Sequence, residues 1–435
     1  MKYYVRLTIL LSLIWGFIAI QRIVIAIIMP AIQADLKFNY TDVGMVISIT
    51  GLVWAFGTVF WSALGDKLGR RPVIVVTTIL AAVFSWITGM VANLGQMLAI
   101  RGALGFFEGG PWGPAVATVQ EEAPEKVRGF TLSFISAAFF LIGVFFGPLL
   151  AVYLLGKFGS WRPVFYIISM PAAVLGVIAI FAMHEPPSVA EGIKARKAGQ
   201  KRIVYDQGHK VRMVDVLKYK NVIVSSIVSI PVMAWLFIYS GFSALFLVKV
   251  HGMNIGQIGA AMAASGIGGF IGEFTMGGIS DHLGRRMTMI LTGFLCACSG
   301  ISIAMMPVGT GLSAFCVLFF FWGLFGAGHF PLYLGTLPAE SVPNEYAGTA
   351  ISIPTGVGEI LGAAVMPTIA GILADKYGLF APIWMAAIAG LVICVISLWY
   401  VETAPKKVAR MVKKPTREDH LLRPFRGRST ARIEM

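Results

Sequence analysis

Apolar runs of about 20 residues, separated by short polar segments, follow one another along this chain of 435 residues. A run of that length, wound as an α-helix, crosses the ~30 Å hydrocarbon core of a membrane. Backbone polar groups in hydrocarbon must bond within their own segment, so each run is expected to be a helix. The pattern predicts twelve spans, at approximately residues 6–31, 43–64, 72–92, 95–119, 129–156, 161–184, 222–249, 256–278, 286–306, 310–337, 346–374 and 379–401.

A short charged cassette occurs twice between predicted spans. Residues 62–71 read SALGDKLGRR and residues 277–286 read GGISDHLGRR, which places Asp66 and Asp281 215 residues apart, about half the chain. Ionised groups are costly in hydrocarbon, so both cassettes are expected in water or at the membrane interface. One copy in each half indicates a duplicated helical membrane protein.

The duplication and a polar segment in the middle of the chain divide it into four parts. We expect an N-terminal six-helix bundle at 1–184, a cytoplasmic linker at 185–221, a C-terminal six-helix bundle at 222–401 and a basic cytoplasmic tail at 402–435. The predicted fold is therefore an all-α membrane protein in which twelve transmembrane helices form two pseudo-symmetric six-helix bundles.

The formal net charge of +14 is concentrated in two places. Nine Lys and Arg residues lie within 185–220, and ten follow Trp399. Basic segments beside membrane spans face the cytoplasm, so the linker and the tail are expected there. An even number of spans places both termini on the same side, so the N-terminus is expected in the cytoplasm too. Anionic lipid is a further expected contact of the basic segments. Since both basic blocks flank membrane spans, a nucleic-acid partner is not expected.

The sequence carries no signature of an enzyme, a cofactor or a metal. It has no phosphate-binding Walker loop, so transport driven by ATP is not expected. The four cysteines fall inside predicted spans, where they are expected to pack as small apolar residues and not to form disulfides or a metal site: Cys296, Cys298, Cys316 and Cys394.

Arg22 falls about halfway along the first predicted span, between Ile18–Ile20 and Ile23–Ile28. A guanidinium at the bilayer centre costs at least ~2.5 kcal/mol on insertion scales. Arg22 must therefore face a polar cavity or a partner. Its planar fork suits a carboxylate held by two hydrogen bonds. It either contacts a substrate anion or forms a fixed ion pair with a glutamate of another helix.

Three further residues inside predicted spans are ionisable candidates for transport chemistry. Arg101 and Glu108 are two helical turns apart, so they share a helix face at a separation of about 10 Å along the axis. Water or a substrate can bridge that gap. Glu108 is one candidate for proton coupling. Glu359, which lies among Gly356, Gly358 and Gly362, is a second candidate; alternatively, it makes a hydrogen bond within its own half.

Two more ionisable residues lie within spans. Glu273 is eight residues before Asp281, so it is expected near the cytoplasmic gate. His329, before Phe330-Pro331, is interpreted as an interior histidine with its bonds satisfied; the alternative is a proton relay.

Aromatic residues on the same spans are candidates for the walls of a substrate cavity. Trp235 and Tyr239 are four residues apart, so they share a face of the seventh span. The other aromatic and amide candidates are Trp54, Trp112, Gln120, Trp322 and Tyr333.

The two cassettes are expected to act as a gate. Their charged groups stand at helix ends, where carboxylate and guanidinium groups can bridge the two halves when the cytoplasmic side is closed. The alternative is that they anchor the loops and fix the topology by their charge. The gating residues are Asp66, Arg70, Arg71, Asp281, Arg285 and Arg286.

The cassettes resemble the G-x-L-x-D-R-x-G-R-R loop of the major facilitator superfamily, with Ser62 for the leading glycine, Lys67 for the first arginine and His282 at that place in the second copy. Arg101 and Gly105 resemble another motif of the superfamily. The resemblance covers about residues 6–401 and implies a secondary transporter, without defining its substrate.

A narrower resemblance is to the anion:cation symporter family, which includes sugar-acid transporters and vesicular glutamate and sialic-acid carriers. Arg22 stands in the slot of that family's Asp-Arg pair, and Arg101, Glu108 and Gly109 resemble its R-x6-E-G signature. The resemblance implies that Arg22 and Arg101 bind the substrate anion and that Glu108 couples protons. Gln21 departs from the pattern, because many members have an acidic proton carrier there.

These observations predict a secondary active transporter of the inner (plasma) membrane. We expect a monomer that imports a small organic anion, a carboxylate or sugar acid, together with H+, by alternating access. The alternatives are a proton-driven exporter of drugs or metabolites, an antiporter of organic anions, and a membrane receptor that binds without transport. Gly143, Gly147 and Pro148 partly resemble the antiporter motif of the fifth span, which would fit an exporter.

Overall fold

A computed structural model describes residues 2–187, 189–191, 213–343 and 346–413, and nearly all of them are helical. The N-terminal half contains α1 (Tyr3–Ile27), α2 (Met29–Leu36), α3 (Tyr40–Leu68), α4 (Arg70–Thr88), α5 (Leu94–Glu108), α6 (Trp112–Glu122), α7 (Glu125–Ala138), η1 (Phe139–Phe146), α8 (Gly147–Phe158) and α9 (Arg162–Ala182). The C-terminal half contains η2 (Met213–Lys218), α11 (Lys220–Lys249), α12 (Ile255–Leu283), α13 (Arg285–Ala304), α14 (Leu312–Ala327), η3 (Leu332–Thr336), α15 (Leu337–Glu340), α16 (Ala347–Val357), η5 (Gly358–Ala363), α17 (Met366–Tyr377) and α18 (Phe380–Ser397), followed by α19 (Pro405–Lys413).

Eleven helical segments among the described residues are long and apolar enough to span a membrane. The remaining predicted span, 95–119, is present as α5 and α6, which are separated by a short break at Gly109–Pro111. Pro111 cannot donate a backbone hydrogen bond to the preceding turn. A Cβ at Gly109 would lie 2.6 Å from the carbonyl oxygen of Trp54, so only glycine allows this close approach to α3. The twelve-helix architecture is thus reached with one broken span.

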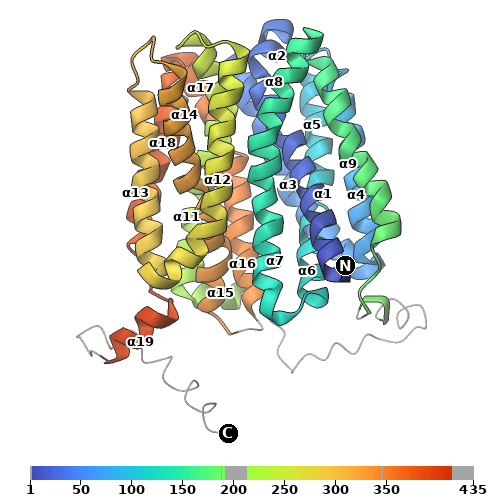
Figure 1. Cartoon of the computed structure of the whole chain (residues 1–435), viewed down its shortest axis with the longest axis vertical. Coiled ribbons are helices and arrows are strands. Elements are labelled where there is room, and N and C mark those ends of the chain that lie inside the picture. Colours follow the sequence, from blue (N-terminus) through green and yellow to red (C-terminus); the bar gives the residue numbers. More distant parts are fainter. Residues whose placement is uncertain (1, 188, 192–212, 344–345, 414–435) are drawn as a thin grey trace.

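The two halves repeat the same packing. In the N-terminal half α3 packs on α5 and α4 on α9; in the C-terminal half α12 packs on α14 and α13 on α18. The halves stand side by side, blue to green and yellow to red in Figure 1, with all long helices roughly parallel. The inner layer between them is formed by α1, α3 and η1 of one half and by α11, α12 and η5 of the other.

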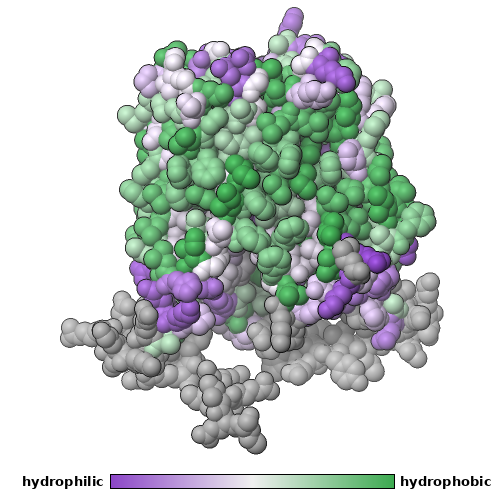
Figure 2. Space-filling view, in the orientation of Figure 1, coloured by the Kyte–Doolittle hydropathy of each residue, from purple (hydrophilic) through white to green (hydrophobic). Residues whose placement is uncertain are grey.

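The outer surface is an apolar belt between two polar ends (Figure 2). Large apolar side chains point outward from the helices, as Phe181 does with 84% of its surface exposed. The interior, in contrast, contains buried charged residues such as Arg22, Arg101 and Glu108. Apolar surface outside and charge inside is the arrangement expected of a protein whose solvent is lipid.

The two ends of the bundle differ in how the halves meet. We name the end with Asp66, Glu121 and Asp281 the linker end, and the end with Tyr40 and Asp375 the far end. The first helix begins at the linker end, and α19 lies there too (Figure 1). Most of the predicted linker and tail, residues 192–212 and 414–435, lies outside the described residues.

At the far end, a carboxylate joins the two halves. Asp375 of α17 accepts hydrogen bonds from the backbone N–H groups of Tyr40 and Thr41, at 2.9 and 2.8 Å, and from the Thr41 hydroxyl at 2.6 Å. These groups form the N-terminus of α3, where a helix favours negative charge. Ser48 and Thr368 add a further hydrogen bond between α3 and α17, at 2.8 Å. The far end is therefore fastened across the halves.

We expect Asp375→Asn to open the far end. The amide loses the charge that favours the helix N-terminus, at a cost of about 1 kcal/mol, which shifts the closed-to-open ratio about fivefold. Spin labels at the exposed positions of Lys37 and Lys376 lie on different halves, so they are farther apart when the far end is open. Double electron–electron resonance should show a larger population at this longer distance in the variant. Asp35→Asn is the matched control, because Asp35 is a far-end carboxylate that pairs with Arg162 of its own half. Equal distance distributions in all three proteins would contradict a latch at Asp375.

Candidate functional site

A cavity of about 140 Å³ lies between the two halves. An engineered apolar cavity of about 150 Å³ binds benzene, so this volume suits a molecule of one small ring. Both halves supply the walls. They are formed by Trp15, Arg22, Trp54, Trp112, Ser136, Phe139 and Phe140 from the N-terminal half, and by Met233, Leu236, Phe237, Glu273, Phe330, Leu334, Ile351, Thr355 and Glu359 from the C-terminal half.

Aromatic rings form most of the apolar wall. Trp15 and Trp112 are in contact, with ring centroids 4.5 Å apart. Phe140 of η1 meets Phe330 across the halves, with centroids 5.8 Å apart. Rings of this kind offer flat apolar surface and, at their faces, a negative potential that attracts cations.

Arg22 is held in the cavity wall by an ion pair that crosses the halves. Its Nη2 donates to Oε2 of Glu359 at 3.0 Å, and both side chains are at most 6% exposed. The guanidinium carbon also lies 4.4 Å from the ring centroid of Phe237 and 5.1 Å from that of Trp54. A buried guanidinium needs a negative partner, and in this structure Glu359 provides it. Of the two alternatives that the sequence leaves open, the structure contains the ion pair with a glutamate of another helix. Arg22 also lines the cavity, and its contact with a substrate anion stays a prediction.

Glu359 reaches Arg22 from an irregular helical turn. It belongs to η5, a π-helical turn between α16 and α17. Gly358 and Gly362 let this turn approach α11 closely, because a Cβ at Gly362 would lie 2.6 Å from Cβ of Met233. A π-turn re-aims the side chains that follow it and is frequent at functional sites. The glycines near Glu359 thus place the carboxylate at the boundary between the halves.

Arg101 supports α1 from behind and does not line the 140 Å³ cavity. Its guanidinium donates to the carbonyl oxygens of Gln21 at 3.0 Å and Arg22 at 3.4 Å, and its Nε donates to the Thr50 hydroxyl at 3.3 Å. With Arg22 it borders a void of about 10 Å³. The structure therefore gives Arg101 contacts that position the backbone of Arg22.

Glu108 is completely buried at the end of α5, beside the break before α6. Neither of its carboxyl oxygens has a hydrogen-bond partner among the described residues. Arg101 and Arg22 are near enough to act on its charge. A buried carboxyl group without a partner is costly and is rarely kept without a function.

Trp235 and Tyr239 lie in the packed interior of the C-terminal half and do not line the described cavity. Their rings are stacked, with centroids 5.4 Å apart, and both contact Trp322. The Tyr239 hydroxyl is bonded to Ser265 of α12. Phe237, on the opposite face of α11, lines the cavity instead. The sequence identifies the helix but not the face that it turns to the cavity.

Other cavity residues are not among the sequence-based site residues. Glu273 of α12, which the sequence places near the cytoplasmic gate, lines the cavity instead and accepts a hydrogen bond from Ser136 of α7, so it stands between the halves. Trp15 is not among the sequence-based candidates, although it lies seven residues before Arg22 and so on the same face of α1. That spacing was the available signal for Trp15. The sequence contains no comparable signal that would identify Ser136 as a cavity residue.

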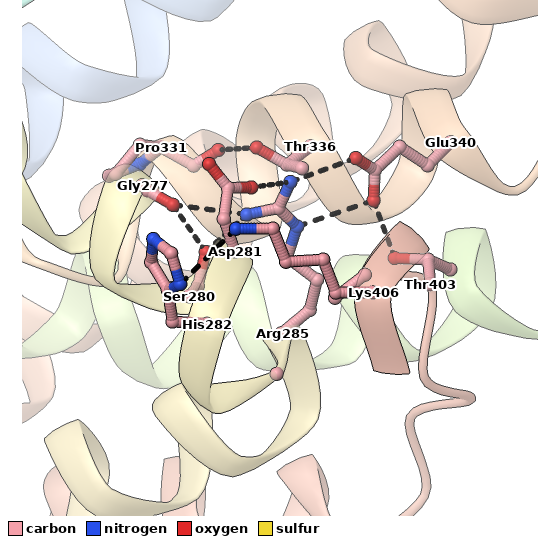
Figure 3. A network of polar contacts seen from close by, with 12 residues as sticks. Gly277, Ser280, Asp281, His282, Arg285, Pro331, Thr336, Glu340, Thr403 and Lys406 are labelled. Carbon is pink, nitrogen blue, oxygen red and sulfur yellow. Dashed lines mark hydrogen bonds and ion pairs between the residues drawn. The ribbon is translucent and has the colours of Figure 1, made fainter. Parts of the chain in front are cut away.

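The second gate cassette is fastened within its own half (Figure 3). The Arg285 guanidinium contacts Asp281 at 2.6 Å and Glu340 at 3.0 Å, and it donates to the carbonyl oxygen of Gly277 at 3.0 Å. Glu402 accepts the backbone N–H of Arg285 at 2.8 Å. Arg286 is exposed beside this network.

The first cassette is arranged similarly. Arg70 pairs with Glu121 at 2.7 Å, and the carboxylate of Glu185 accepts the backbone N–H groups of Arg70 and Arg71. Asp66 is exposed at the linker end. In both copies the ion pairs of the cassette arginines join groups of one half. Their expected part in closing the linker end stays a prediction about another state of the protein.

We expect Arg285→Ala to destabilise the C-terminal half by about 2 kcal/mol, because the variant lacks the buried guanidinium and its several charge-assisted hydrogen bonds. Arg286→Ala is the matched control, since Arg286 is exposed. Thermal unfolding of the purified variants in detergent measures both. Equal melting temperatures for the two variants would show that the network in Figure 3 contributes little to stability.

Comparisons with known proteins agree with this architecture. The family model of the Major Facilitator Superfamily matches residues 11–360. The probable 4-methylmuconolactone transporter of Cupriavidus pinatubonensis is 24% identical, over 84% of this chain and 82% of its own. The inner membrane metabolite transport protein YhjE of Escherichia coli is 25% identical, over 79% and 80%. A solved bacterial homologue of the human lysosomal transporter Spinster, inward-facing and unoccupied, has a TM-score of 0.72 at 17% identity, over 92% of this chain and 96% of that one.

Proposed function

The chain belongs to the major facilitator superfamily, and we propose that it is a proton-coupled symporter that imports a small organic anion through the cavity between its halves. It is a secondary transporter of metabolites and not an enzyme. The observation that carries the proposal is the guanidinium of Arg22, which lines the cavity and is paired across the halves with Glu359.

The chemistry of Arg22 suits a carboxylate or sugar acid as substrate. Arginine presents a planar fork of donors that matches a carboxylate. The fork is positioned by Arg101, which holds the carbonyl oxygens of Gln21 and Arg22. Aromatic rings supply an apolar wall for the rest of a small molecule. One relative is named as a probable 4-methylmuconolactone transporter, which supports a small metabolite as the substrate.

Coupling follows from competition for one guanidinium. In this structure the carboxylate of Glu359 is bound to the guanidinium of Arg22. A proton on Glu359 removes the charge of that partner, and the substrate carboxylate then takes its place on Arg22. The exchange leaves one negative charge beside Arg22 before and after, so no unpaired charge is buried. A substrate can shift the equilibrium only by such differential binding.

In this proposal one proton is carried for each anion: Glu108 takes it up and passes it to Glu359, so the two carboxyl groups act in sequence. Glu108 lies within the electrostatic reach of Arg101 and Arg22, and its carboxyl oxygens have no hydrogen-bond partner among the described residues. A negative charge on Glu108 offsets the two arginines, and a proton removes that offset. Anion binding at Arg22 then replaces the negative charge that the proton has cancelled. Proton and anion therefore enter the protein together.

We assign the linker end to the cytoplasm, because the basic linker and tail adjoin it. The far-end contacts of Asp375 then close the outer side, and the ion pairs of the cassettes among the described residues do not join the halves. We therefore infer an inward-facing state. During transport the halves would rock about the central cavity. The ion pairs of the two cassettes, now within single halves, would exchange partners when the cytoplasmic side closes.

A thermal-stability screen tests the proposed substrate class. A ligand at 100 times its Kd stabilises the folded state by about 2.7 kcal/mol. We expect small carboxylates and sugar acids to raise the melting temperature of the purified protein, and amides of the same molecules to leave it unchanged. Stabilisation by lipophilic cations alone would favour an exporter. A carboxylate that binds but is not taken up by proteoliposomes would indicate a receptor.

A further inference from the structure

The cavity contains a second polar pair that the exchange at Arg22 does not use. Glu273 of α12 is 5% exposed, and its Oε1 accepts a hydrogen bond from the hydroxyl of Ser136 on α7. Its other oxygen, Oε2, is buried and has no hydrogen-bond partner among the described residues. Both residues line the cavity together with Arg22. An unpaired buried oxygen is unfavourable, so a donor placed here by a ligand gains a bond without displacing one.

Aromatic rings line the same cavity as these polar groups. Phe140 lies one helical turn from Ser136, and Phe330 contacts it from the other half at 5.8 Å between ring centroids. Phe237 lies against the guanidinium of Arg22. The cavity lining thus includes the guanidinium of Arg22, an unpaired carboxyl oxygen of Glu273 and flat apolar ring surfaces. Its volume of about 140 Å³ leaves room for one ring.

We propose that Oε2 of Glu273, whose other oxygen is held by Ser136, forms a second subsite that accepts a hydrogen bond from a hydroxyl group of the substrate. This rests on the proposed function, in which the substrate carboxylate binds Arg22. The substrate class is then a monocyclic, hydroxylated carboxylic acid. A hydroxyl is favoured over an ammonium group because it adds no second charge to a mainly apolar cavity. The hydroxyl of Ser136 shows that Glu273 accepts such a donor.

Uptake by proteoliposomes at a fixed proton gradient tests the second subsite. The probes are benzoate, 3-hydroxybenzoate and 4-hydroxybenzoate, which share a ring and a carboxylate. For the wild type we expect KM for at least one hydroxylated acid to be about tenfold lower than KM for benzoate. Glu273→Leu should reduce that ratio to about one. Glu273→Gln retains an acceptor oxygen and should retain a ratio above one, as should Ser136→Ala.

The outcomes separate this inference from the proposed function. Equal KM values for the three acids in the wild type, or an unchanged ratio in Glu273→Leu, would overturn the second subsite and leave the carboxylate site intact. If Glu273→Leu is not produced as folded protein, the wild-type ratio decides. Failure of all three acids and of other small carboxylates to enter or bind would overturn the proposed function itself.

Discussion

Arg22→Ala is expected to reduce carboxylate uptake about 100-fold at low substrate concentration, because two charge-assisted hydrogen bonds to the substrate are lost. The variant also leaves Glu359 buried without its partner, which costs about 3–5 kcal/mol of stability. Uptake of a radiolabelled carboxylate by proteoliposomes, corrected for the amount of folded protein, measures the first effect. Arg22→Lys keeps the charge but loses the fork, so it should recover only a small part of the activity.

A double variant separates substrate binding from a structural ion pair. Arg22→Ala combined with Glu359→Gln removes the uncompensated buried charge, so it should unfold at a higher temperature than Arg22→Ala alone. If Arg22 binds the substrate, the double variant stays inactive although it is stable. Recovery of uptake in the double variant would mean that Arg22 serves as a partner for Glu359 and that the substrate binds elsewhere.

The second large effect is expected for Glu108→Gln. Glutamine fills the same buried space but cannot carry the proton, so a pH difference should no longer drive accumulation. For one proton per anion, a difference of one pH unit supports about tenfold accumulation in the wild type, which corresponds to about 1.4 kcal/mol. The variant should approach equal concentrations on both sides. It should still exchange internal for external carboxylate, since Arg22 is retained.

Glu122→Gln is the matched control for that measurement. Glu122 ends α6 at the linker end, on the other part of the same broken span, and it lies 3.5 Å from His184. It should accumulate carboxylate as the wild type does. Tenfold accumulation in Glu108→Gln would contradict a coupling function for Glu108 and leave Glu359 as the proton site.

The apolar pattern predicts most of this fold because each span must satisfy its backbone internally, whatever its neighbours do. The broken span shows the limit of that argument. Gly109 and Pro111 are visible in the sequence, but the contact of Gly109 with the backbone of Trp54 depends on how α3 and α5 pack. Rotation about a helix axis is equally hidden. Trp235 and Phe237 are both apolar and two residues apart, and only packing decides which of them faces the cavity.

The partner of Arg22 illustrates what sequence reasoning leaves open. The cost of a buried guanidinium requires some negative partner, and the sequence indicates either a substrate or a glutamate. Glu359 is 337 residues away, in the other half, so local spacing contains no information about their pairing. Asp375 and the N-terminus of α3 meet across the halves for the same reason, and the sequence gives no indication of this contact.

The most direct test of proton-coupled anion import is the proton movement that accompanies it. A pH electrode in a weakly buffered, sodium-free suspension records the medium when a small carboxylate is added to proteoliposomes, with protein-free liposomes subtracted to remove simple diffusion of the acid. Proton-coupled import predicts alkalinisation that depends on the protein, with at least one proton entering for each carboxylate. Uptake of the carboxylate without any such alkalinisation would contradict it.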